Sequence, residues 1–71
     1  MKVTLYTRRG CHLCDQAKQA IDSARRQGPF EYEEFDIDSN PDLRELYNEQ
    51  VPVIAIDGGR ATVDELLRRL A

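Results

Sequence analysis

The order of apolar and polar positions predicts alternating strands and helices in the first half of the chain. A β-branched and aromatic stretch at residues 2–7 predicts a strand that stops at Arg8-Arg9-Gly10. Apolar residues then recur at helical spacing between positions 13 and 24. Gly28-Pro29 predicts the end of this helix, with Gly28 in a left-handed conformation. Residues 30–37 predict a second strand, with aromatic and apolar side chains in both phases.

The second half predicts a short helix, a buried hairpin and a final helix. Ser39-Asn40-Pro41 favours a helix start, and this helix should end near Asn48. Residues 51–56 form the most continuous apolar run, which is typical of a strand deep in a sheet. Asp57-Gly58-Gly59 predicts a tight turn into a very short return strand. Thr62, with glutamate three residues later, predicts a capping box at the start of the last helix.

The resulting order, β-α-β-α-β-β-α, predicts an α/β fold with a mixed four-stranded sheet flanked by three helices. A strand, a crossover helix and a second strand give a right-handed parallel unit, and the hairpin adds an antiparallel edge. The 71 residues are too few for two domains, so we expect residues 1–71 to form one domain.

Composition and charge exclude several functional classes. With 41% hydrophobic and 32% charged residues, the chain is too apolar for a disordered tail and lacks a membrane-length apolar run. Its start shows no signal peptide, so we expect a cytoplasmic protein that does not contact membranes. The net charge of −3 argues against nucleic-acid binding. Six of the ten cations lie in residues 1–28, so any docking surface should be bipolar.

Two cysteines, Cys11 and Cys14, follow the first predicted strand. Closing so short a loop stabilises a fold by roughly 2 kcal/mol at best, which makes a structural staple a poor explanation. Cys11 lies where the predicted helix begins, and free N–H groups there stabilise an anion, so we expect it to be the more acidic thiol. Cys14, one turn later, is placed to attack a mixed disulfide formed at Cys11. The spacing favours two-electron thiol chemistry.

Other interpretations of the cysteine pair remain open. A CxxC pair is half of a zinc site, but the chain offers only His12 as a further soft ligand, so we expect no metal site within one chain. Two copies sharing a metal ion or an iron–sulfur cluster through Cys11 are the alternative. A non-catalytic interaction domain with an inert pair is the third interpretation.

Two segments resemble glutaredoxins, a family with the thioredoxin fold. The segment Thr4-Leu5-Tyr6-Thr7-Arg8-Arg9-Gly10-Cys11-His12-Leu13-Cys14 is similar to the glutaredoxin active-site segment, and Val51-Pro52-Val53-Ile54 is similar to its second landmark. The resemblance covers nearly the whole chain. It implies a cis bond before Pro52 and places that proline opposite the cysteine pair. It also implies that the backbone of Val51 aligns a bound substrate.

Four further residues are candidates for the site. Arg8, Arg9 and His12 flank Cys11 and are predicted to tune its thiolate, with an ordinary solvated position as the alternative for each. Tyr6 is a candidate substrate contact, with packing as its alternative role.

The chain departs from typical glutaredoxins in two places. His12-Leu13 stands between the cysteines where the family has Pro and an aromatic residue. The Gly-Gly that helps bind a glutathione carboxylate in the family is replaced near Thr62-Val63, with acidic Asp64 and Glu65 following. We therefore expect weak glutathione binding and an electron supply from glutathione or from a reductase.

The sequence thus predicts a small monomeric dithiol oxidoreductase that needs no cofactor. Cys11 is its predicted nucleophile and Cys14 its resolving thiol. Its predicted substrate is a disulfide in a protein or a small molecule.

Overall fold

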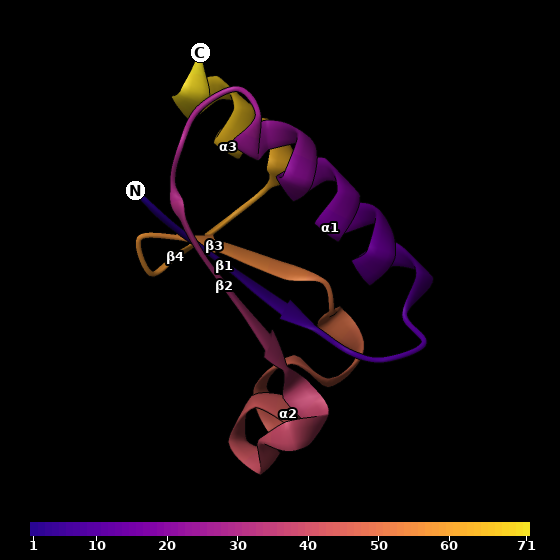
Figure 1. Cartoon of the computed structure of the whole chain (residues 1–71). Helices are drawn as coiled ribbons and strands as arrows, with labels where there is room; N and C mark the ends of the chain where they lie inside the picture. The colour runs from indigo at the N-terminus through magenta and orange to yellow at the C-terminus, as the bar shows by residue number, and fades with distance from the viewer.

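The chain folds into four strands and three helices in the predicted order (Figure 1). The computed structural model describes residues 1–71. Single 3₁₀ turns at Ile37–Ser39 and Asn48–Gln50 flank the second helix. The elements are β1 Lys2–Thr7, α1 His12–Arg25, β2 Glu31–Asp36, α2 Pro41–Tyr47, β3 Val53–Ile56, β4 Gly59–Ala61 and α3 Val63–Leu70.

The strands form one mixed sheet in the order β2-β1-β3-β4. β1 and β2 are parallel across the α1 crossover, whereas β1–β3 and β3–β4 are antiparallel. The predicted four-stranded mixed sheet is therefore confirmed. The tight turn between β3 and β4 is confirmed too, with positive φ at Asp57 and Gly58.

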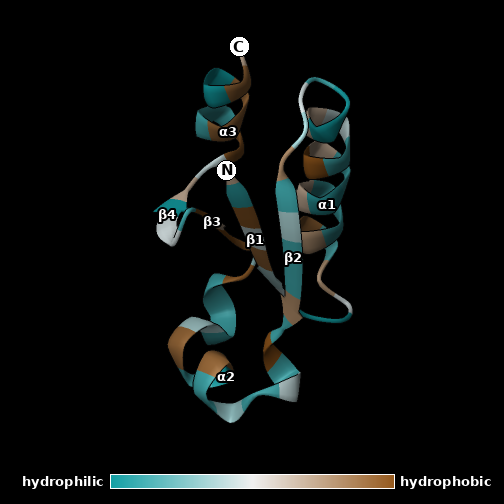
Figure 2. Cartoon of the chain, turned by 60° about the vertical axis from the view of Figure 1, so that its left-hand side comes forward, coloured by the Kyte–Doolittle hydropathy of each residue, from teal (hydrophilic) through white to brown (hydrophobic).

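The core lies between the sheet and the pair α1 and α3. Figure 1 shows both helices on one side of the sheet and α2 on the other. Hydrophobic colouring concentrates on β1 and β3, whereas the edge strand β2 is mainly hydrophilic (Figure 2). This pattern follows because β1 and β3 are the two inner strands. The buried core cluster comprises Val3, Leu5, Ala17, Ile21, Ala24, Ile54, Ile56 and Leu66.

The structure corrects the prediction for Gly28. Its φ is not positive, because α1 already ends at Arg25 and is capped by Arg26. Gly28 instead allows a close approach, since a Cβ there would lie 3.2 Å from the Leu70 side chain of α3. Packing against Leu70, rather than a helix cap, therefore favours glycine at this position.

The capping box and two strand boundaries also differ from the prediction. The Thr62 hydroxyl accepts a hydrogen bond from the Glu65 amide at 3.2 Å, but the Glu65 side chain pairs with Arg69, so only half of the box forms. The second strand is Glu31–Asp36 rather than 30–37, and the third is Val53–Ile56 rather than 51–56. Proline cannot donate to the sheet, so β3 begins after Pro52. No helix is long and apolar enough to cross a membrane.

Candidate active site

Cys11 and Cys14 lie at the N-terminus of α1 and form a disulfide, with their Cα atoms 5.2 Å apart. Cys11 is the N-cap, and its Sγ accepts a hydrogen bond from the Cys14 backbone N–H at 3.1 Å. Cys11 is partly exposed, whereas Cys14 is 0% exposed. Gly10, with φ of 72°, turns the chain into the helix. The two sulfurs thus differ in accessibility and in hydrogen bonding.

Sheet register brings the second landmark to the same end of the fold. Val53 is paired with Tyr6, so Pro52 and Val51 lie beyond Tyr6 at the end of β1 that leads into the cysteine loop. The Val51–Pro52 bond is cis, as the resemblance to glutaredoxins implied. Both residues are partly buried. The cysteine loop follows β1 and the Val51–Pro52 segment precedes β3, so both lie at the same end of two neighbouring strands.

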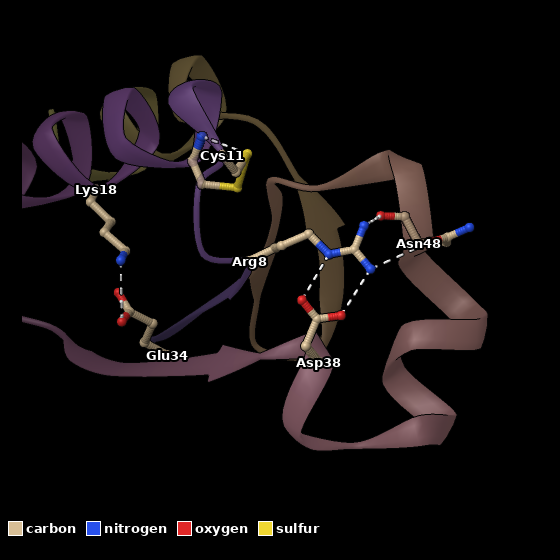
Figure 3. Close-up of a disulfide and its surroundings, with 7 residues drawn as sticks. Arg8, Cys11, Lys18, Glu34, Asp38 and Asn48 are labelled. Carbon is tan, nitrogen blue, oxygen red and sulfur yellow. Dashed lines mark hydrogen bonds and ion pairs between the residues drawn. A yellow bond between two sulfur atoms is a disulfide. The ribbon is translucent and has the colours of Figure 1, made fainter.

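Arg8 does not extend toward the sulfurs. Its guanidinium points away from the disulfide and meets Asp38 and Asn48 (Figure 3). The Nε and Nη2 atoms donate to the two Asp38 carboxylate oxygens at 3.0 and 2.9 Å. This hydrogen bonding raises the pKa of Arg8 and lowers the pKa of Asp38. The charge predicted to tune Cys11 is thus paired with a carboxylate.

The other predicted site residues take three different positions. Arg9 is exposed in the loop before Cys11 and forms no ion pair or side-chain hydrogen bond. His12 is exposed as the first residue of α1. Tyr6 packs between Phe35 and Tyr47, with ring centroids 5.8 and 4.7 Å away, and burial raises its pKa. These contacts favour the packing role for Tyr6.

The site contains features that the sequence analysis missed. The partners of Arg8 are 30 and 40 residues away in the sequence, so no local pattern indicates them. Thr7 is 5% exposed, and its buried hydroxyl has no hydrogen-bond partner. It is the only polar residue among the buried ones.

A polar pocket lies beside the cysteine loop. It is lined by residues of the loop, of α1 and of β2, including Arg9, Asp15 and Lys18. Both Lys18 and Glu34 line this pocket, and the Lys18 ammonium nitrogen lies 3.6 Å from a Glu34 carboxylate oxygen (Figure 3). No group of three or more His, Cys, Asp or Glu side chains in the chain is arranged to hold a metal ion. A shared metal site would therefore need ligands from a second molecule.

Comparison with known proteins agrees with this geometry. Residues 2–70 match the family model described as Glutaredoxin-like domain (DUF836). A crystal structure of a structural genomics target from X. campestris is 33% identical, with a TM-score of 0.73, over 96% of this chain and 93% of that chain. The solution structure of the same target gives 39% identity and a TM-score of 0.63, over 89% of this chain and 78% of that chain.

A second solved protein is also similar. The solution structure of a protein from Nitrosomonas europaea is 40% identical, with a TM-score of 0.65, over 75% of this chain and 62% of that chain. None of the curated proteins matches the chain. The sheet order and the solved neighbours identify the fold as thioredoxin-like, as the resemblance implied.

Proposed function

This chain belongs to the glutaredoxin-like domain family, and on that premise we propose that it is a dithiol oxidoreductase. The observation that supports this most is the asymmetry of the cysteine pair. Cys11 is partly exposed at the N-terminus of α1 and accepts a hydrogen bond from the Cys14 N–H, whereas Cys14 is fully buried. A substrate from solution therefore meets the sulfur of Cys11 first.

In the first step, the Cys11 thiolate attacks one sulfur of a substrate disulfide. The substrate S–S bond breaks, a mixed disulfide forms at Cys11, and the other substrate sulfur leaves as a thiolate that takes a proton from water. The Cys14 N–H and the free N–H groups at the start of α1 stabilise the attacking thiolate before this step.

In the second step, the Cys14 sulfur attacks Cys11 Sγ, and the proton of its thiol passes to the substrate sulfur that leaves. The mixed disulfide breaks, the remaining substrate sulfur leaves reduced, and Cys11–Cys14 becomes a disulfide. The substrate gains two electrons and the protein loses two. An external thiol, from a reductase or from glutathione, returns the pair to the dithiol.

Val51 and Pro52 are the proposed substrate-aligning residues. They lie at the same end of the strands as the cysteine loop. Because β3 begins only after Pro52, the Val51 backbone is outside the hydrogen-bond ladder of the sheet. An extended substrate segment beside the disulfide has its own N–H and C=O groups to satisfy. The backbone of Val51 is the group that meets this need.

We propose that glutathione is a weak electron donor for this protein. The first turn of α3 contains Asp64 and Glu65, and like charges there oppose a docking carboxylate, although the free N–H groups of the helix attract it. Comparing saturation with glutathione against reduction through thioredoxin reductase tests this. Efficient, saturable glutathione turnover would show that the proposal is wrong.

The central experiment compares single-cysteine variants in reduction of a peptide with one disulfide. Cys14→Ser should trap a covalent mixed disulfide detectable by mass spectrometry, and Cys11→Ser should lose exchange. Cys14→Ala repeats the test without a buried hydroxyl, with circular dichroism to check folding. If Cys11→Ser kept turnover, Cys11 would not be the nucleophile. If the wild-type protein reduced no disulfide from any thiol donor, the proposed function would be wrong.

A further inference from the structure

Arg8 bridges three segments that are distant in the sequence. It lies in the loop after β1, and its guanidinium forms a bidentate ion pair with Asp38 in the 3₁₀ turn after β2. Its Nη1 donates to the backbone carbonyl of Asn48 at 3.2 Å, and Nη2 is 3.4 Å from the Asn48 side-chain oxygen. With a side chain 28% exposed, Arg8 is the least exposed residue in any ion pair of the chain.

The bridge joins the two halves of the candidate site. Arg8 stands three residues before Cys11, and Asn48 stands three residues before Val51. Three residues span at most roughly 10 Å even when fully extended, so each anchor lies within that distance of the position it precedes. Figure 3 shows the guanidinium between the loop that leads to Cys11 and the turn that contains Asn48.

The backbone ladder of the sheet holds neither segment at these positions, and the turn that contains Asn48 has one other side-chain contact with the sheet, from the Arg60 guanidinium of β4 to the Gln50 side-chain oxygen at 3.0 Å. β1 ends at Thr7 and β3 begins at Val53, so the ladder fixes neither the cysteine loop nor residues 48–52. α2 contacts mainly the two 3₁₀ turns beside it. The only side-chain hydrogen bonds between the cysteine loop and the Asn48 turn come from Arg8.

We infer that Arg8 is a positioning residue that fixes the Val51–Pro52 segment relative to Cys11. This inference deepens the proposed oxidoreductase function and rests on it. It replaces direct tuning of the Cys11 thiolate by Arg8, because the guanidinium is paired with a carboxylate and directed away from the sulfurs.

Replacing Arg8 by lysine distinguishes the positioning role from a thiolate-tuning role. A thiolate-tuning role needs only a positive charge, which lysine also supplies. The bridge needs a planar fork that reaches a carboxylate and a carbonyl together, and an ammonium group lacks this geometry. If Arg8 positions the Val51–Pro52 segment, Arg8→Lys should therefore behave like Arg8→Gln. If Arg8 tunes the Cys11 thiolate, Arg8→Lys should behave like the wild-type protein.

The test measures kinetics and backbone mobility in the full chain. For reduction of a peptide with one disulfide, Arg8→Lys and Arg8→Gln should both raise KM on the order of tenfold. This is less than the roughly hundredfold that a 1 Å misplacement of reacting groups costs. kcat should change less than about threefold, since the sulfurs themselves stay in place. The pH midpoint of Cys11 alkylation should not move. Arg26→Gln removes the same charge at the exposed C-cap of α1 and should leave all three quantities unchanged.

Backbone mobility provides a readout independent of activity. Amide ¹⁵N order parameters at residues 48–51 should fall from the rigid range near 0.85 toward 0.6 in both Arg8 variants, and stay rigid in Arg26→Gln. Unchanged order parameters would overturn the inference even if the protein proved inactive. A shifted alkylation midpoint in Arg8→Gln that Arg8→Lys restores would overturn it in favour of charge tuning. An inactive wild type with mobile Arg8 variants would refute the proposed function alone.

Discussion

In the reduced protein, we expect iodoacetamide to modify Cys11 and to spare Cys14 while the fold is intact. Cys14 is 0% exposed, so its alkylation requires the structure to open. In the disulfide-bonded structure, Cys11 is partly exposed, and its sulfur accepts a hydrogen bond from the Cys14 N–H at 3.1 Å. The start of α1 adds the positive end of the helix dipole. Both effects favour the thiolate of Cys11 over its thiol.

The size of the effect follows from these two contacts. A hydrogen bond to a charged group contributes about 1.5–3 kcal/mol, and a helix end contributes about 0.3–1 kcal/mol. An unperturbed thiol is ~3% ionised at pH 7. Together the contacts increase the thiolate fraction of Cys11 roughly 10- to 30-fold, close to full ionisation at the upper end. A less basic thiolate is also a weaker nucleophile, so the shape of the rate against pH is a better measure than the absolute rate.

The assay follows alkylation of Cys14→Ser, which keeps the backbone N–H at position 14, between pH 4 and pH 9. The rate should level off before pH 8. The converse variant, Cys11→Ser, should react only as fast as the protein opens. A rate for Cys14→Ser that still rose about tenfold between pH 7 and pH 8, as for an ordinary thiol, would refute the reasoning. So would equal reactivity of the two cysteines.

Three further predictions concern stability, measured by urea unfolding. Leu66→Ala should cost about 2–5 kcal/mol because Leu66 is fully buried in the core, whereas Leu46→Ala, at a side chain 63% exposed, should cost less than about 0.5 kcal/mol; equal losses would contradict the assigned core. Thr7→Val should be neutral or stabilising by up to about 1–3 kcal/mol because it removes a buried hydroxyl that has no hydrogen-bond partner; a clear destabilisation would show that the hydroxyl does have a partner. Gly58→Ala should cost about 1–2 kcal/mol at its φ of 86°, whereas Gly59→Ala, whose Cβ would lie 3.5 Å from its nearest neighbour, should be tolerated; a tolerated Gly58→Ala would mean that the turn relaxes.

The element order was predictable because the helices show apolar residues at helical spacing, whereas the strands are short β-branched, aromatic or apolar runs bounded by turn residues. Residues 51–56 are apolar without interruption, and β3 is one of the two inner strands of the sheet. The turn at Asp57-Gly58 follows from local backbone preference alone. Gly28 shows where local reasoning fails. Its position after a helix suggests a cap, but in the fold it lies against Leu70, 42 residues later.

In the candidate site, too, some features could be predicted from the sequence and others could not. The cysteine pair is visible in the sequence itself, whereas the cis bond before Pro52 was implied by the resemblance of residues 51–54 to a glutaredoxin segment. Tyr6 was ambiguous because an aromatic residue at a strand end suits both packing and contact with a ligand. Its two ring neighbours come from β2 and α2, which no local motif joins to β1.

Arg8 and Arg9 are neighbours in the sequence but differ in their contacts. Arg8 is neutralised by Asp38, and Arg9 is exposed, where water and salt weaken its effect on Cys11. Besides the exposed His12, the groups placed to stabilise the thiolate are backbone donors, namely the Cys14 N–H and the other free N–H groups at the start of α1. These donors exist because Cys11 is the N-cap, and Gly10 lets the chain turn into that position. On the function proposed above, the reactivity of Cys11 therefore depends on where α1 begins, and Arg8 acts on the geometry of the site rather than on the thiolate.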